Sequence, residues 1–158
     1  KDVHSVSLTG GEPLLSVDFL KEFLPLVSKK IYLETNATLR DKFLEIKQYV
    51  DIVSADIKLE SATGIKDSYK FHDKFFEACK GIETFAKIVF NLKITNEEIC
   101  KCCELGKKYG IELVLQPEML EDKMSVTSDF CAQTLDKFLE NYENVRLIPQ
   151  VHKFLDVR

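Results

Sequence analysis

Apolar runs with the length of β-strands alternate along this chain with segments that have the hydrophobic period of an amphipathic helix. This order is typical of βαβ units, which build a parallel sheet through right-handed crossovers. Ile88-Val89-Phe90 and Leu113-Val114-Leu115 are apolar at every position, as expected of strands covered on both faces. We therefore predict an α/β fold of parallel strands, and periodicity alone does not distinguish an open sheet from a barrel. The expected strands are 3–8, 31–34, 52–57, 86–92, 111–116 and 145–149, and the expected helices are 17–28, 39–50, 68–84, 96–109 and 125–142.

Several helix ends carry recognisable signals. Thr95 and Glu98 have the spacing of a capping box, which predicts a helix that begins after Thr95. Gly110 follows a basic last turn and predicts a left-handed stop. Pro25 falls inside the expected helix 17–28, which it should kink or shorten.

Length and charge limit the classes of partner. The chain has 158 residues, 45% of them hydrophobic, which suits one globular domain over 1–158. Its net charge of −4 argues against nucleic acid or an anionic membrane as the main partner. No apolar run approaches the ~20 residues that span a bilayer, and no secretory signal is visible, so we expect a cytoplasmic protein. The first strand begins within three residues of Lys1, which indicates a processed terminus or a piece of a longer chain.

The cysteines are odd in number, and without a secretory signal they indicate reduced thiols rather than disulfides. Three of them lie close together on an expected helix, where Cys100 and Cys103 share a face that Cys102 cannot join. We therefore expect buried apolar side chains here rather than a metal cluster. The five cysteines are Cys79, Cys100, Cys102, Cys103 and Cys131.

The sequence Gly10-Gly11-Glu12-Pro13 follows the first expected strand directly. Paired glycines let the backbone bend sharply and approach a ligand without a Cβ in the way. The Glu12 carboxylate can accept hydrogen bonds from an ammonium group, and Pro13 stiffens the exit of the turn. This pattern predicts a ligand site at the C-terminal end of a strand. The alternative is a connecting turn with a solvated Glu12.

Polar residues also follow the second and third expected strands. Asn36 is suited to a turn with positive φ and Thr38 to a helix cap, or Asn36 contacts a ligand. Asp56 and Lys58 are two residues apart and so face the same way on a strand. They form a structural ion pair or bind a zwitterion, and together with Glu12 they would suit the ammonium and carboxylate of an amino acid.

Two further strand ends offer amide side chains. Gln116 can both donate and accept, which suits the edge of a purine-like ring, or it ties the strand end to the next loop. Gln150 and His152 follow the last expected strand. His152 is either a ligand contact or a structural histidine.

Together these segments resemble the radical S-adenosylmethionine superfamily, in which Gly-Gly-Glu-Pro follows the second barrel strand. Their order and spacing are similar to those of the 7-carboxy-7-deazaguanine synthase family, as is the closing Pro149-Gln150-Val151-His152-Lys153. The resemblance covers nearly the whole chain, and its segments are 33–38, 51–58, 115–117 and 145–153. It implies a partial (β/α) barrel that lacks its first βα unit. It also implies a lyase of queuosine and 7-deazapurine biosynthesis, which contracts the ring of 6-carboxy-5,6,7,8-tetrahydropterin.

The resemblance also implies roles for individual residues. Gly10, Gly11 and Glu12 would hold the amino group of S-adenosylmethionine, and Lys58 its carboxylate. Ser54 and Asp56 would lie near its ribose or ammonium group. Asn36, Gln116, Gln150 and His152 are weaker candidates for contact with cofactor or with a pterin-like substrate. The intact enzyme would use a 4Fe–4S cluster, Mg²⁺ and an electron donor.

One departure from the family pattern is serious. The family binds its cluster through Cys-x₃-Cys-x₂-Cys before the Gly-Gly-Glu-Pro loop, and the nine residues before Gly10 contain no cysteine. The family's Mg²⁺-binding residue also belongs to that segment, so no catalytic or metal-ligating residue is assigned here. We expect a fragment that is catalytically silent alone and whose unpaired edge strand promotes dimerisation or aggregation.

Three alternatives remain open. Asp56-Ile57-Lys58 is also similar to the cofactor-binding motif of glycyl-radical-enzyme activases. A non-catalytic α/β module that binds a nucleotide would explain the missing cluster motif. An aldolase- or isomerase-like barrel is the third alternative, although no base–nucleophile pair is visible.

Overall fold

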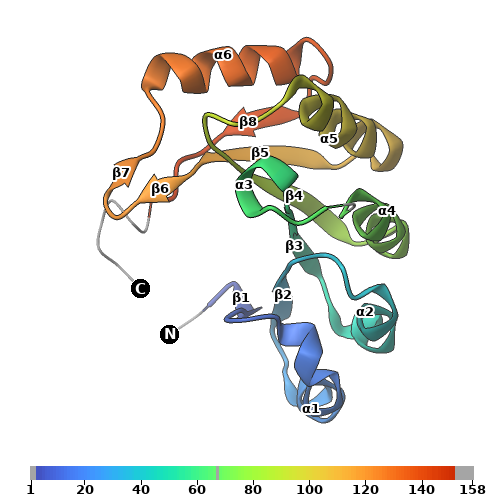
Figure 1. The fold of residues 1–158 in the computed structure, drawn as a ribbon. Helices are drawn as coiled ribbons and strands as arrows, with labels where there is room; N and C mark the ends of the chain where they lie inside the picture. The colour runs from blue at the N-terminus through green and yellow to red at the C-terminus, as the bar shows by residue number, and fades with distance from the viewer. Residues whose placement is uncertain (1–2, 67, 152–158) are drawn as a thin grey trace. The chain divides into compact units, whose positions relative to one another are not determined.

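The computed structural model describes residues 3–66 and 68–151 (Figure 1). The chain divides into two compact units. Among the described residues, the first unit contains 3–56 and 69–85, and the second contains 57–66, 68 and 86–151. The strand β4 (Glu83–Phe90) begins in the first unit and ends in the second.

The first unit is built on parallel strands with helices on one side. The strand β2 lies between β1 and β3, with Ser7 opposite Tyr32 and Glu34 opposite Ser54. In Figure 1 the helices α1, α2 and α4 lie on the same side of these strands. The elements are β1 (Ser5–Leu8), α1 (Val17–Phe23), β2 (Lys30–Thr35), α2 (Arg40–Ile46), β3 (Ile52–Ile57) and α4 (Tyr69–Ala78), with the 3₁₀ helices η1 (Pro13–Ser16), η2 (Leu24–Leu26) and η3 (Lys47–Tyr49).

Alternation along β2 separates an apolar face from a polar face. Ile31 and Leu33 are buried, and behind them the rings of Phe43 on α2 and Phe75 on α4 pack with centroids 4.9 Å apart. Tyr32 and Glu34 point to the other face and are half-buried. The apolar face forms the core of this unit.

The second unit also pairs parallel strands with helices. β5 pairs with β8, with Leu113 opposite Val145. The helix α5 contacts β5, α6 contacts β8, and the two helices contact each other. A short antiparallel hairpin, β6 with β7, follows β5. The elements are α3 (Glu60–Thr63), α5 (Asn96–Tyr109), β5 (Glu112–Pro117), β6 (Met119–Leu120), β7 (Lys123–Met124), α6 (Ser128–Leu139) and β8 (Val145–Leu147).

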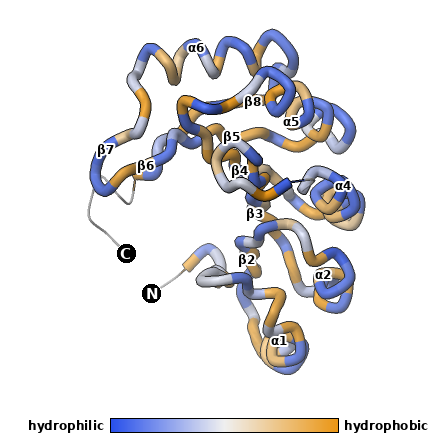
Figure 2. The backbone as a smooth tube through the Cα atoms, viewed as in Figure 1, coloured by the Kyte–Doolittle hydropathy of each residue, from blue (hydrophilic) through white to orange (hydrophobic). Residues whose placement is uncertain are grey.

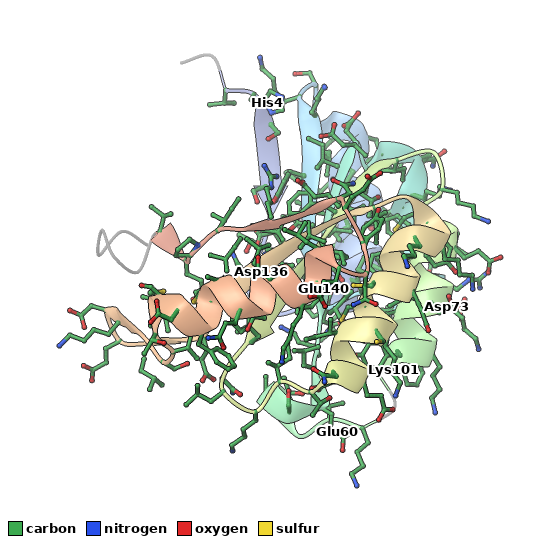
Figure 3. All side chains as sticks on the ribbon, turned by 90° about the horizontal axis from the view of Figure 1, so that it is seen from above. His4, Glu60, Asp73, Lys101, Asp136 and Glu140 are labelled. Carbon is green, nitrogen blue, oxygen red and sulfur yellow. The ribbon has the colours of Figure 1, made fainter. Side chains whose placement is uncertain are left out.

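Both long helices of the second unit are amphipathic. Figure 2 shows hydrophilic and hydrophobic residues alternating along α6. Phe138 is fully buried on this helix, whereas Asp136 and Glu140 are exposed, as Lys101 is on α5 (Figure 3). Polar outer faces of this kind are solvated, and the apolar stripes hold the helices to the strands. Within the part of the chain that the structure describes, no helix combines the length and apolar character that crossing a membrane requires.

The predicted parallel-strand α/β class is confirmed: within the described residues, the larger sheet has six strands with helices between them, and β6 and β7 form a separate hairpin. Helix 96–109 and strand 52–57 have the predicted bounds. The capping box of Thr95 and Glu98 is present, and Gly110 has the left-handed φ of 66°. Pro25 does shorten its helix, since α1 ends at Phe23.

Other bounds were wrong. The predicted helix 68–84 ends at Ala78, and β4 begins at Glu83. Gly81 lies between them with a φ of 88°, a conformation that a helix cannot continue through. The predicted helix 125–142 is shorter at both ends: α6 begins at Ser128, because Thr127 caps it through its hydroxyl, and it ends at Leu139.

Candidate functional site

The Gly-Gly-Glu-Pro segment is a sharp loop between β1 and η1. Gly10 and Gly11 have φ angles of 89° and 55°, in the region that glycine adopts without steric cost. Among the described residues, no atom lies within 4 Å of the position that a Cβ would take at either glycine. The backbone of both glycines is therefore open on that side, and its contact with a ligand stays a prediction.

The Glu12 carboxylate joins this loop to the loop after β2. Its Oε1 accepts hydrogen bonds from the Leu14 N–H at 3.1 Å and from the Thr35 hydroxyl at 2.9 Å. Its Oε2 accepts a hydrogen bond from the Asn36 N–H at 2.7 Å. The alternative of a solvated Glu12 is wrong. A carboxylate has about four lone-pair sites, so three donors hold Glu12 in place and leave capacity for one more.

The turn after β2 differs from the sequence expectation by one residue. Ala37, not Asn36, has the positive φ, at 54°. The Asn36 Oδ1 accepts hydrogen bonds from the Thr38 N–H at 3.1 Å and from the Thr38 hydroxyl at 2.5 Å. Thr38 therefore does not cap α2, whose N-cap is Leu39 without a side-chain hydrogen bond. The short Asn36 side chain reaches forward to Thr38 and forms a local turn two residues before α2 begins.

Ser54 presents a buried polar atom on the polar face of β3. Its hydroxyl has no hydrogen-bond partner within the described residues, although Ser54 is completely buried. Buried hydroxyls are nearly always satisfied, so an orphan one indicates a missing water or ligand. Asp56 lies two residues further along the same face and is half-buried. Glu12 with spare acceptor capacity, two open glycines and an orphan hydroxyl fit a ligand that carries an ammonium group and hydroxyls.

The remaining predicted residues that the structure describes belong to the second unit. Lys58 follows β3 by one residue and is half-buried, and its placement opposite Glu12 remains a prediction. Gln116 lies near the end of β5, and Gln150 follows β8. The chain after β8 stays beside β5, because the Ile148 N–H donates to the Leu115 carbonyl at 2.9 Å. His152 lies outside the described residues.

The cysteines are buried with one exception. Cys79, Cys102, Cys103 and Cys131 are buried, but Cys100 is exposed, contrary to the expectation that it shares a buried face with Cys103. Residues three apart on a helix are offset by about 60°, so one of a pair can leave the buried stripe. Burial raises the pKa of Cys79 to about 12 and that of Cys103 to about 11. Among the residues that the structure describes, no three His, Cys, Asp or Glu side chains gather in a way that would hold a metal ion.

Sequence reasoning missed two residues that support the Glu12 loop. Thr35 is buried at the end of β2, where its hydroxyl donates to Glu12 and accepts from the Ala37 N–H at 3.2 Å. His72 is buried on α4, with Nδ1 3.3 Å from the Ala37 carbonyl oxygen. The only available signal for His72 was its place among Phe71, Phe75 and Phe76, a polar ring in an apolar helical segment.

Comparison with known proteins supports the family resemblance. No model of a protein family matches the chain. The 7-carboxy-7-deazaguanine synthase of Geobacter sulfurreducens is 33% identical over 159 residues, which cover 97% of this chain and 64% of that protein. The 7-carboxy-7-deazaguanine synthase of Archaeoglobus fulgidus is 33% identical, with 99% and 68% covered. The chain thus spans about two thirds of the length of these relatives.

Solved structures show the fold. A crystal structure of archaeal TYW1 matches with a TM-score of 0.63 and 18% identity, covering 88% of this chain and 50% of that one. The 3-keto-D-glucoside 4-epimerase YcjR from E. coli matches with a TM-score of 0.51 and 11% identity, covering 98% and 70%. At such identities they support the parallel α/β class alone. The sequence matches go further: this chain belongs to the 7-carboxy-7-deazaguanine synthase family within the radical S-adenosylmethionine superfamily.

Proposed function

We propose that this chain supplies the S-adenosylmethionine-binding part of a 7-carboxy-7-deazaguanine synthase. The whole enzyme would be a cytoplasmic lyase that contracts the ring of 6-carboxy-5,6,7,8-tetrahydropterin by radical chemistry, with Mg²⁺ and an electron donor. The observation that carries the proposal is the Glu12 carboxylate, which three donors hold beside two open glycines at the end of β1.

Glu12 is suited to the amino group of the cofactor. Its donors orient both oxygens without using all their acceptor capacity, so an ammonium group meets a carboxylate that is already in place. Such charge-assisted hydrogen bonds are about twice as strong as neutral ones. Gly10 and Gly11 let the same group approach the backbone closely.

Other residues would hold the rest of the cofactor and the substrate. Ser54 and Asp56, two residues apart on one face of β3, would lie near the ribose or the ammonium group of the cofactor. Lys58 would pair with the cofactor carboxylate. The side chains left for pterin-like substrate contact are Asn36, Gln116, Gln150 and His152, since amide groups and a neutral imidazole can both donate and accept.

The residues present do not fit the cluster. Thiolates hold the irons of a 4Fe–4S centre, and the 158 residues contain no Cys-x₃-Cys-x₂-Cys sequence. When bound to a reduced cluster, S-adenosylmethionine supplies the radical chemistry of the superfamily. We derive no step through the cluster from this chain, and propose that the chain alone binds the cofactor without cleaving it.

Calorimetric titration tests the binding role. S-adenosylmethionine is titrated into the chain and into the variants Glu12→Gln and Glu22→Gln, the second being an exposed control on α1. A parallel titration uses 5′-methylthioadenosine, which has the nucleoside but no amino-acid group. We expect Glu12→Gln to lower the affinity for S-adenosylmethionine at least tenfold, which corresponds to about 1.4 kcal/mol of binding free energy. The affinity for 5′-methylthioadenosine should not change.

Two results would overturn the proposal. One is the absence of binding at about 1 mM S-adenosylmethionine, and the other is equal affinity of the wild type and Glu12→Gln. Formation of 5′-deoxyadenosine by the chain after anaerobic iron–sulfur reconstitution would contradict catalytic silence. Equal affinity for both ligands would favour a nucleotide-binding module instead.

A further inference from the structure

His72 contacts the turn 35–38, whose residues Thr35 and Asn36 donate hydrogen bonds to Glu12. It is completely buried on α4, and its Nδ1 lies 3.3 Å from the carbonyl oxygen of Ala37. A carbonyl oxygen only accepts hydrogen bonds, so the proton of this contact belongs to Nδ1. Both residues lie in the first unit, 35 positions apart in sequence.

Ala37 needs such support because its backbone is strained. Its φ of 54° is in the left-handed region, where a Cβ crowds the following carbonyl. The turn compensates with hydrogen bonds on either side, from the Ala37 N–H to the Thr35 hydroxyl and from the Thr38 N–H to Asn36 Oδ1. The Ala37 carbonyl is a further polar group of this turn, and His72 is its partner.

The same turn positions the carboxylate. The hydroxyl of Thr35 and the N–H of Asn36 donate to the two different oxygens of Glu12, at 2.9 Å and 2.7 Å. A change in the backbone at Ala37 would move both donors, because they are the two residues before it. A continuous series of hydrogen bonds thus leads from His72 through the turn to Glu12.

We propose that His72 is a positioning residue for the ammonium site: its Nδ1–H holds the left-handed Ala37 and thereby orients the Glu12 carboxylate. This proposal rests on the proposed function of Glu12. Phe75, one turn further along α4, is fully buried, and the ring of Tyr69 meets the imidazole edge-on with the two ring centroids 6.4 Å apart. Because the site is closed to solvent, bulk water does not readily replace the donor.

Two buried amide substitutions separate positioning from packing. His72→Asn keeps an N–H close to the place of Nδ1, whereas His72→Gln moves the amide towards the place of Nε2. The first measurement is the hydrogen-exchange rate of the backbone amides of Asn36 and Ala37, with Ile99 on α5 as internal reference. The second is the affinity for S-adenosylmethionine and for 5′-methylthioadenosine.

We expect His72→Gln to raise the hydrogen-exchange rates of the Asn36 and Ala37 amides at least tenfold. It should also lower the affinity for S-adenosylmethionine at least fivefold. Ile99 exchange and the affinity for 5′-methylthioadenosine should not change, and His72→Asn should resemble the wild type. Unchanged exchange in His72→Gln overturns the proposal, as does unchanged affinity despite faster exchange.

The outcomes also separate this proposal from the function on which it rests. If the wild type does not bind S-adenosylmethionine, the proposed function fails, while the exchange rates still decide whether His72 holds the turn. If His72→Gln does not fold, the test moves to Ala37→Gly, which adopts the left-handed region freely. In that background the proposal predicts that His72→Gln folds and loses less than twofold in affinity, and a variant that still fails to fold counts against it.

Discussion

The backbone N–H of Asn36 donates to Oε2 of Glu12 at 2.7 Å, so the loops after β1 and β2 share one carboxylate. Glu12 therefore has a structural task besides the binding task that we propose for it. A carboxylate whose orientation is fixed by the fold needs little rearrangement when a cation arrives. The same sharing means that substitutions around Glu12 affect both stability and binding, and the two have to be measured separately.

Thr35→Val should lower the free energy of unfolding by about 2 kcal/mol. Valine keeps the shape of threonine, but it deprives Glu12 of one donor and leaves the buried Ala37 N–H without its acceptor. Urea unfolding followed by circular dichroism measures the change. Thr63→Val is the matched control, because the Thr63 hydroxyl also donates once and accepts once, but on an exposed residue. We expect that control to stay within about 0.5 kcal/mol of the wild type. Equal losses in both variants would contradict a special role for Thr35.

The course of the main elements could be predicted because it depends on local patterns. Thr95 and Glu98 are three residues apart, and both halves of their capping box are visible in the sequence. The four-residue helix α3 and the two-residue strands β6 and β7 escaped notice, because such short segments contain too few residues to establish a period. The predictable elements are therefore those that are long enough to show a hydrophobic period or that carry a local capping signal.

The loop that carries the candidate site could be predicted from local residue types, but its hydrogen bonds could not. Gly10, Gly11 and Glu12 can be recognised in the sequence by their residue types and by their place after a strand. The bond from Thr35 to Glu12 joins residues 23 positions apart and depends on the register that sets Leu8 opposite Leu33. No local pattern contains that register. The structural role of Glu12, as the acceptor for the loop after β2, could therefore not be predicted from the sequence.

Glu98 should make stability depend on pH in the acid range. Burial raises the pKa of its carboxyl, but hydrogen bonds from Ser61 and Thr95 outweigh burial and hold the pKa below its ordinary value of 4.5. A carboxyl with a lowered pKa in the folded state stabilises above the unfolded pKa, and this contribution is lost as the pH falls through the folded pKa. We therefore expect the wild type to lose stability as the pH falls below about 4.5.

The variant Glu98→Gln isolates this contribution. It keeps a capping-box residue but replaces the charged acceptor of the Ser61 and Thr95 N–H groups, so it should lose about 1–2 kcal/mol at pH 7. The difference from the wild type should shrink as the pH is lowered, in urea unfolding at a series of pH values. A difference that is constant down to the acid limit of folding would show that the charge of Glu98 contributes nothing.

Cys100 should be the first cysteine to react with iodoacetamide at pH 8 in the native protein. The thiolate is the reactive form, and the raised pKa values of Cys79 and Cys103, about 12 and 11, leave almost none of it at that pH. Trypsin cuts after Lys101, so mass spectrometry distinguishes Cys100 from Cys103. All five cysteines should react in urea, and Cys100→Ser should abolish the fast native labelling. Native labelling of Cys103 at the same rate would refute its burial.

Gly106→Ala should destabilise the second unit even though alanine favours a helix over glycine by about 1 kcal/mol. A Cβ at this buried position of α5 would lie 2.7 Å and 2.9 Å from two ring carbons of Tyr142. The ring cannot move aside freely, because its hydroxyl donates to the Ile111 carbonyl at 3.0 Å. We expect a loss of about 1–3 kcal/mol in urea unfolding, as for other overpacked sites.

A double-mutant cycle shows whether this loss comes from the close approach. In a Tyr142→Leu background the ring is gone, so Gly106→Ala should cost nothing or stabilise, which corresponds to a coupling of at least about 1 kcal/mol. Gly110→Ala is the control for backbone strain without a clash: its φ is 66° and nothing lies within 4 Å of its Cβ position. That substitution should cost about 1 kcal/mol in either background. If Gly106→Ala costs the same with and without the Tyr142 ring, helix packing at Gly106 is not limited by Tyr142.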